Sequence, residues 1–210
     1  MNISQIRKEY AQKRLTLAEC DSSPLIQFEL WLKEAILADV DEPTAMCLST
    51  VSTDGRPSSR TVLLKGLENG RFIFYTNYQS RKGVQMERAP GVSLSFFWPE
   101  IERQVLVEGI AEKITTQESD EYFHSRPYES RIGAWASRQS RTACSRVEIE
   151  RRFKEFSARY PEFVPRPPYW GGYAVSADRA EFWQGRPGRL HDRILYTLKE
   201  GGWCRMRLYP

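Results

Sequence analysis

Apolar residues near the N-terminus recur at intervals of three and four, whereas farther along the chain they alternate with polar residues. The first pattern predicts a helix over about 24–39, with Ser22 or Ser23 as its cap. Its expected core-facing residues are Leu25, Phe28, Leu32, Ala35 and Ile36. The second pattern is interrupted by turn sequences, and it predicts strands over 44–52, 59–65, 71–76, 91–98 and 102–114. Strands that follow one another so closely form an antiparallel meander.

Helices interrupt the strands after residue 114. Thr115 with Glu118, and Ser145 with Glu148, have the three-residue spacing of a capping box, so each pair predicts a helix start. A proline-rich connection then leads to strands over 171–175, 180–184, 190–198 and 203–208. Many short strands with a few helices between them favour an α+β, mainly β, antiparallel barrel over a doubly wound parallel sheet. We expect a single domain over 1–210, with the strands in 161–210 completing the barrel.

Composition narrows the class of protein. Hydrophobic residues make up 40% and charged residues 28%, and no apolar run approaches the roughly 18 residues of a membrane span. The N-terminus lacks the layout of a secretory signal, so we expect a cytoplasmic protein. Four scattered cysteines and two histidines offer little material for a zinc site. The net charge of +4 is too mild to indicate a nucleic-acid-binding protein.

The segment 189–196 carries the clearest candidate chemistry. In a strand, Arg189, His191 and Arg193 share one face. If that face meets solvent, the pattern needs no function, and spacing alone favours neither interpretation. If it lines a cavity, an anion has to lie between the like charges.

Two further segments place cations beside the free backbone amides of a helix start. Ser80, Arg81 and Lys82 open a helix expected to run to Arg88, and cations there oppose the helix dipole unless an anion binds. A similar layout occurs at 125–130. Taken alone, each segment is more often a solvated surface turn than a phosphate site.

The segment 60–65 has a cation at each end. Alternation sets Arg60 and Lys65 on opposite faces unless a bulge intervenes, so we expect them to contact different anions. An ordinary strand with charged ends accounts for the same spacing. Trp183 and Gln104 offer a flat wall and a hydrogen-bonding wall for an aromatic ligand, although a Trp at a strand end is more often part of a core.

Nine sequence blocks, taken together, are more specific than any of these segments alone. They are RTVLLK (60–65), FYT (74–76), SRK (80–82), ERQV (102–105), YFHSRP (122–127), IGAWASRQS (132–140), WGGY (170–173), EFWQG (181–185) and RLHDR (189–193). With these blocks in this order over nearly its whole length, the chain resembles the pyridoxine (pyridoxamine) 5′-phosphate oxidase family.

The resemblance implies a homodimeric, FMN-binding split β-barrel with flanking helices and with the flavin at the subunit interface. The residues that match the family's FMN contacts are Arg60, Thr61, Val62, Leu63, Leu64, Lys65, Tyr75, Thr76, Arg81, Lys82, Gln104, Gln139, Ser140, Trp183 and Arg193. The residues that match its substrate contacts are Arg7, Lys8, Glu9, Tyr10, Lys65, Tyr122, Arg126, Ser130, Arg189, Leu190 and His191. Arg189 and His191 are the implied catalytic residues, and residues 1–20 are the implied mobile segment that closes on bound substrate.

The implied reaction oxidises pyridoxamine or pyridoxine 5′-phosphate to pyridoxal 5′-phosphate, with a hydride passing from C4′ to the flavin and oxygen being reduced to hydrogen peroxide. Another split-barrel flavoprotein, such as a flavin reductase, should lack the substrate set that includes Tyr122, Arg126 and Arg189. A protein that only stores or delivers the vitamer should have disrupted flavin residues, and these are intact. A nucleic-acid-binding protein should gather basic residues with exposed aromatics.

Overall fold

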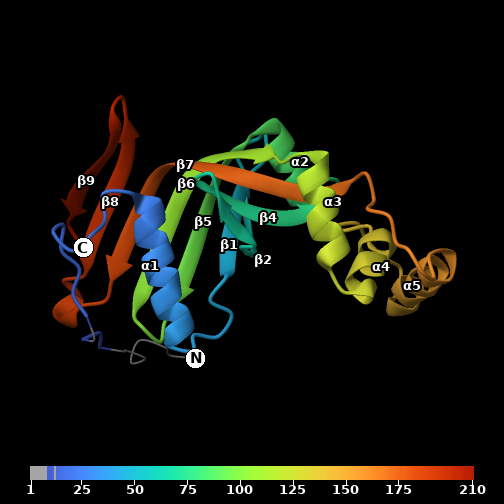
Figure 1. The fold of residues 1–210 in the computed structure, drawn as a ribbon, viewed down its shortest axis with the longest axis horizontal. Coiled ribbons are helices and arrows are strands. Elements are labelled where there is room, and N and C mark those ends of the chain that lie inside the picture. The colour runs from blue at the N-terminus through green and yellow to red at the C-terminus, as the bar shows by residue number, and fades with distance from the viewer. Residues whose placement is uncertain (1–8, 12) are drawn as a thin grey trace.

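The computed structural model describes residues 9–11 and 13–210, and within them all strands join one antiparallel sheet (Figure 1). The strands are β1 (Ala45–Val51), β2 (Pro57–Leu63), β3 (Gly66–Glu68), β4 (Arg71–Asn77), β5 (Gly91–Trp98), β6 (Arg103–Lys113), β7 (Trp170–Gln184), β8 (Asp192–Lys199) and β9 (Gly202–Leu208). The main path runs β2-β1-β5-β6-β7-β4-β3, and the β8-β9 hairpin extends from β7. The expected antiparallel, mainly β class is confirmed.

The long strand β7 is where the sheet divides. One of its edges pairs with β6, while on the other edge residues 170–176 pair with β4 and residues 179–184 pair with β8. The prediction of two separate strands here is wrong, because Ser176 and Asp178 are exposed and interrupt the apolar pattern without ending the strand. The register shifts beside Gly109, where an added Cβ would lie 2.1 Å from the Ser176 carbonyl oxygen.

The helix α1 (Pro24–Leu37) covers one face of the sheet and supplies much of its core. The Phe28 ring lies 4.7 Å from that of Phe96, and the Trp31 ring lies 5.1 Å from that of Phe182. The helix was placed correctly, but its expected inner face was partly wrong. Trp31 lies inside, whereas Ile36 is 53% exposed because it falls at the rim of the buried stripe.

A second, smaller core lies at the far end of the sheet, where three helices gather beyond β4 and the start of β7 (Figure 1). These are α3 (Thr116–Ser125), α4 (Tyr128–Ala136) and α5 (Arg146–Arg159). The predicted starts of α3 and α5 are confirmed, and Thr115 with Glu118 forms a complete capping box. At α5 the Glu148 carboxylate instead accepts from the Cys144 N–H. The helix α4 was not predicted, because Pro127 at its N-cap gives no side-chain cap.

The helix α2 (Arg81–Arg88) connects β4 and β5 and begins where expected. Its N-cap is Ser80, whose hydroxyl oxygen accepts from the Gly83 N–H. A Cβ at Gly83 would lie 2.2 Å from the Tyr78 carbonyl oxygen, so this first turn packs against the preceding loop more closely than another residue would allow. A short 3-10 turn, η1 (Pro187–Arg189), precedes β8. Across the described part of the chain, no helix is long and apolar enough to cross a membrane.

Candidate active site

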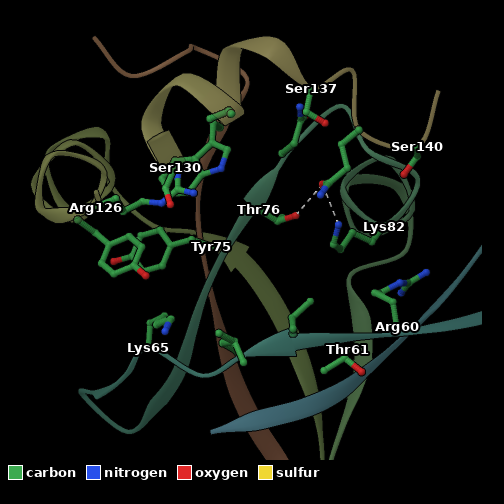
Figure 2. A pocket seen from close by; sticks show the side chains of 18 of the residues that line it. Arg60, Thr61, Lys65, Tyr75, Thr76, Lys82, Arg126, Ser130, Ser137 and Ser140 are labelled. Carbon is green, nitrogen blue, oxygen red and sulfur yellow. Dashed lines mark hydrogen bonds between the residues drawn. The ribbon is translucent and has the colours of Figure 1, made fainter. Parts of the chain in front are cut away.

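A cavity of about 930 Å³ opens between the sheet and the helices at the end of the molecule where α2, α3 and α4 lie (Figure 2). Its walls come from β2, β4, the start of α2, the α3–α4 junction and the loop after α4. Fourteen of the residues predicted to bind a ligand line it: Arg60, Thr61, Val62, Leu63, Lys65, Tyr75, Thr76, Arg81, Lys82, Tyr122, Arg126, Ser130, Gln139 and Ser140. The structure therefore brings together segments spread over 80 residues of sequence.

The cavity is strongly cationic. Five of its lining residues are Arg or Lys, and none of the described residues that line it is acidic. Figure 2 shows Arg60 and Lys82 toward one end, and Lys65 and Arg126 toward the other. Like charges gathered in a concave, partly desolvated site raise one another's energy unless an anion binds between them. The cavity is therefore suited to an anionic group at each of its two ends.

At the first end, Lys82 is only 8% exposed. Its ammonium group donates to the Gln139 side-chain oxygen at 3.0 Å and to the Ser80 hydroxyl at 3.3 Å, and both acceptors are neutral. The same Gln139 oxygen accepts from Thr76, so the loop after α4 is tied to α2 and β4, as the dashed lines in Figure 2 show. Burial, together with the positive charge of Arg60, lowers the pKa of Lys82 to about 8.

At the second end, Arg126 lies over an aromatic stack. Its guanidinium carbon is 4.5 Å from the centre of the Trp170 ring, and Tyr75 and Tyr122 stack face to face with ring centres 3.7 Å apart. Burial lowers the pKa of Arg126. One buried terminal nitrogen of this residue has no hydrogen-bond partner in the part of the chain that the structure describes. A buried, unsatisfied cationic donor that lines a cavity fits an anionic group such as a phosphate.

The prediction that Arg60 and Lys65 face opposite ways is wrong. The strand β2 ends at Leu63, so the alternation of strand side chains does not extend to Lys65, and both cations reach the same cavity from different ends. Leu64 is also placed differently from its neighbours. It is 4% exposed and packs in the main core rather than among the residues that line the cavity.

The remaining described site residues form a second group near the C-terminal end of β7. The ring of His191 lies 4.6 Å from that of Trp183, and the Tyr10 ring lies 5.6 Å from Trp183 and 5.9 Å from His191. Gln104 is paired with Trp183 across the β6–β7 ladder. The exposed Glu9 precedes Tyr10, whereas Arg7 and Lys8 lie outside the described residues.

The strand interpretation of the 189–193 segment is wrong, because β8 begins only at Asp192. Arg189 ends the turn η1 with φ of 61°, and exposed Leu190 follows it, so alternation cannot align Arg189 with Arg193. Gly188, also at positive φ, gives this turn its shape. Arg193 does not project freely, since its guanidinium forms two hydrogen bonds to the Glu181 carboxylate at 2.7 and 2.9 Å.

The backbone around His191 favours one tautomer of its neutral ring. Its Nδ1 atom accepts a hydrogen bond from the Arg186 backbone N–H at 3.1 Å. Burial and the charge of Arg189 lower the pKa of His191, which favours the neutral ring. Because Nδ1 is the acceptor, the neutral ring carries its proton on Nε2 and offers that N–H as a donor.

The cavity and the second group lie at opposite ends of β7. Trp170, at the start of the strand, lines the cavity, while Trp183 is thirteen residues farther along. At about 3.3 Å per residue, this corresponds to roughly 40 Å of strand. Figure 1 shows the same separation, with the α3–α5 end of β7 far from the β8–β9 end. One protomer therefore cannot bring Arg189 and His191 to its own cavity.

Sequence reasoning missed several residues that line the cavity. Asn77, Ser137 and Trp170 are among them, and the last begins the WGGY block. Each had a local signal in the sequence. Asn77 follows Thr76, Ser137 lies within the block 132–140, and Trp170 begins the WGGY block. Local sequence alone does not show whether a residue in a paired strand or at a helix end faces a cavity or the core.

Comparisons with known proteins agree with this site. The family model described as pyridoxamine 5′-phosphate oxidase matches residues 32–160, and one described as the pyridoxine 5′-phosphate oxidase C-terminal dimerisation region matches residues 170–210. The chain is 59% identical to a pyridoxine/pyridoxamine 5′-phosphate oxidase of Chromobacterium violaceum and 57% identical to one of Bacteroides thetaiotaomicron. Each match covers 100% of this chain and 99% of the relative.

Solved structures agree on the fold. PhzG from Burkholderia lata, in complex with tetrahydrophenazine-1-carboxylic acid, superposes with a TM-score of 0.90 at 29% identity, covering 95% of this chain and 100% of that one. A pyridoxamine 5′-phosphate oxidase-related, FMN-binding protein from Nostoc punctiforme reaches 0.72 at 17% identity, covering 90% and 100%. These neighbours confirm the expected split barrel, and the match over 170–210 supports the expected homodimer. The chain belongs to the pyridoxamine 5′-phosphate oxidase family.

Proposed function

We propose that the protein is an FMN-dependent oxidase that converts pyridoxamine 5′-phosphate and pyridoxine 5′-phosphate to pyridoxal 5′-phosphate, with oxygen as electron acceptor and hydrogen peroxide as by-product. The observation that carries the proposal is the cavity with five cations and no acidic residue among its described lining. Both FMN and the substrate carry a phosphate, so two anionic groups have to be held in one site. Relatives that carry this name match the chain over its full length.

Each end of the cavity would bind one of the two phosphates. Arg60, Arg81 and Lys82 meet beside the start of α2, where free backbone amides add further donors, and this end would hold the FMN phosphate. Lys65, Tyr122, Arg126 and Ser130 lie at the other end and would hold the substrate phosphate. The unpartnered buried nitrogen of Arg126 supports this division.

When bound, FMN would supply the hydride-accepting chemistry and the reaction with oxygen. The residues of the chain bind and orient. A phosphate held at Arg126 fixes one end of the substrate, and Arg189 with His191 would lie over its pyridine ring. His191, which carries its proton on Nε2, can donate a hydrogen bond to a ring substituent without changing its own charge. Orientation of this kind accounts for much of the rate that an enzyme contributes to such a step.

The complete site needs two protomers. The cavity and the Arg189–His191 group are far apart in one chain, and the second group lies within the region matched by the dimerisation model. In a homodimer, the cavity of one protomer would meet the second group of the other. Gln104, Trp183 and Arg193 would then approach the flavin from the same side as Arg189 and His191. We further propose that 1–210 act as a single domain and that the enzyme is cytoplasmic.

A flavin reductase on the same fold is the second candidate, and PhzG shows that a relative with this fold can hold a tricyclic ligand. The substrate-phosphate end of the cavity distinguishes the candidates, since a reductase for free flavins has no use for a second phosphate site. The stacked Tyr75 and Tyr122 rings and the unsatisfied Arg126 favour the oxidase.

The experiment that tests the function compares phosphorylated and dephosphorylated substrates. The purified protein should release FMN on denaturation and should produce hydrogen peroxide and pyridoxal 5′-phosphate from pyridoxamine 5′-phosphate. Pyridoxamine, which lacks the phosphate, should react far more slowly at the same concentration. A protein that binds no FMN, or that oxidises a nicotinamide cofactor faster than it oxidises either vitamer, would contradict the proposal.

Mixed dimers test the two-protomer site. Arg126→Ala damages the cavity and Arg189→Ala damages the second group, so each homodimer should be nearly inactive at low substrate concentration. Random mixing should produce half hybrid dimers, in which one of two sites is intact. Activity should then recover to about a quarter of the wild-type value. If the mixture stays as inactive as the separate variants, both groups belong to one protomer's site.

A further inference from the structure

Gln85 lies on α2, three residues after Lys82, and does not line the cavity. It is 6% exposed. Its side-chain oxygen accepts two hydrogen bonds, from the Thr50 hydroxyl at 2.7 Å and from the Ser58 hydroxyl at 3.0 Å. A hydroxyl group has one proton to donate, so both hydroxyls have committed their protons to Gln85. Only lone pairs remain on their other sides.

Those lone pairs accept hydrogen bonds from the Arg60 guanidinium. Its Nη1 donates to the Thr50 hydroxyl oxygen at 2.6 Å and to the Leu48 carbonyl at 3.1 Å, and its Nη2 donates to the Ser58 hydroxyl oxygen at 2.7 Å. The direction of every bond is fixed, because a guanidinium group can only donate. Gln85 thus determines which way two hydroxyl protons point, and the hydroxyl oxygens determine where the guanidinium lies.

The arrangement leaves the charge of Arg60 available to a ligand. All three acceptors are neutral, so none cancels the positive charge as a carboxylate would. A guanidinium has five N–H donors, and these bonds use three. Among the described residues, these bonds leave the Nε–H and one Nη2–H for a group in the cavity. Burial, and then the neighbouring charge of Arg81, lower the pKa of Arg60.

We propose that Gln85 is a positioning residue for the cofactor phosphate: through Thr50 and Ser58 it holds the Arg60 guanidinium at the same end of the cavity as Lys82. This proposal rests on the proposed function, since it takes the anion at this end to be the phosphate of FMN. Gln85 and Lys82 belong to the same helix, so a single element sets the positions of both cations. Without the amide oxygen, the two hydroxyls can turn their protons toward Arg60, and the guanidinium loses its fixed acceptors.

The test separates the phosphate from the rest of the flavin. The full-length protein is stripped of flavin, and its affinities for FMN and for riboflavin, which lacks the phosphate, are measured from the quenching of flavin fluorescence. Gln85→Met has a similar volume but no acceptor in the position of the amide oxygen. We expect it to lower the FMN affinity about tenfold, the loss expected when one charge-assisted hydrogen bond to the phosphate is misaligned. The riboflavin affinity should be unchanged.

Gln27→Met is the matched control. Gln27 is a buried glutamine on α1, 4% exposed, whose side-chain oxygen accepts from the Asp21 N–H, and none of the described residues of α1 lines the cavity. This variant should leave the ratio of FMN to riboflavin affinity at the wild-type value. In an Arg60→Ala background, Gln85→Met should add no further loss of FMN affinity, because the group it positions is gone.

A second pair of variants keeps the proposal testable if Gln85→Met does not fold. Thr50→Val removes the hydroxyl and should reduce the FMN affinity selectively, while Thr50→Ser keeps it and should restore the wild-type ratio. Equal losses for FMN and riboflavin, or a full additional loss in the Arg60→Ala background, would overturn the positioning role. If the wild-type protein itself binds both flavins equally, the proposed function fails instead.

Discussion

The pH dependence of FMN binding should report the buried ammonium group of Lys82. This group is 8% exposed and its hydrogen-bond acceptors, Ser80 and Gln139, are neutral. Burial first, and then the charge of Arg60, lower its pKa from 10.5 to about 8. In the flavin-free protein, Lys82 therefore loses its proton near pH 8, well below the value for a lysine in water.

Binding a phosphate dianion reverses this shift, because the negative charge favours the protonated amine. Below pH 8 the lysine is already charged, and binding needs no additional proton. Above pH 8 the protein has to take up a proton when the phosphate binds, so the association constant falls by up to tenfold per pH unit. Between pH 7 and pH 9.5 the affinity for FMN should fall about 30-fold, the amount expected for one group that titrates near pH 8.

The assay is fluorescence titration of the flavin-free protein with FMN at a series of pH values. Lys82→Met should bind FMN more weakly at pH 7 and should show no comparable fall above pH 8. Riboflavin, which has no phosphate to stabilise the ammonium, should bind the wild-type protein with little pH dependence in this range. A wild-type affinity for FMN that is constant from pH 7 to pH 9.5, or the same fall in Lys82→Met, would show that Lys82 is not the group that titrates.

Four other outcomes follow from the site. Arg126→Ala should raise the KM for pyridoxamine 5′-phosphate by roughly 10- to 150-fold with a smaller effect on kcat, because it removes a charge-assisted contact to a phosphate that does not change during hydride transfer. Arg189→Ala should lower kcat by about 100-fold, since it displaces the reacting atoms, and flavin reduction at the wild-type rate in a single turnover at saturating substrate would contradict its placement. Both variants should retain a normal FMN content. Sedimentation at micromolar concentration should show a homodimer, and a flavin-loaded monomer would contradict the two-protomer site.

Local patterns in the sequence predicted much of the fold. The helix over 24–37, the strand over 91–98 and the capping box at Thr115 were identified because each depends on neighbouring residues. The continuous strand β7 and the helix α4 were not. The exposed Ser176 and Asp178 break the apolar alternation within β7, and Pro127 begins α4 without a side-chain cap. Pairing with β6 and packing against α5 hold these elements in place, and neither contact can be seen locally.

The site residues likewise fall into those that the sequence predicted and those that it did not. Resemblance to a family pointed to the residues that line the cavity, and the first turn of α2 carried its own signal in Ser80 and Lys82. The alternation of strand side chains gave the wrong orientation for Lys65 and Arg189. Lys65 follows the end of β2 and Arg189 precedes the start of β8, so neither side chain is oriented by a strand. Gln85 had no signal of its own. Its role depends on two hydroxyls from the neighbouring strands β1 and β2, and the register between these strands brings both to one oxygen.

Anaerobic reduction of the bound flavin shows whether this protein presents the carbon C4′ of a phosphorylated vitamer to FMN. The purified protein, with oxygen removed, is mixed with pyridoxamine 5′-phosphate, and the visible flavin absorption is followed through one turnover. We expect the absorption to bleach completely and to return when oxygen is admitted, with one equivalent of pyridoxal 5′-phosphate formed for each flavin. Pyridoxamine at the same concentration should bleach it far more slowly. A flavin that stays oxidised with saturating pyridoxamine 5′-phosphate would contradict the account.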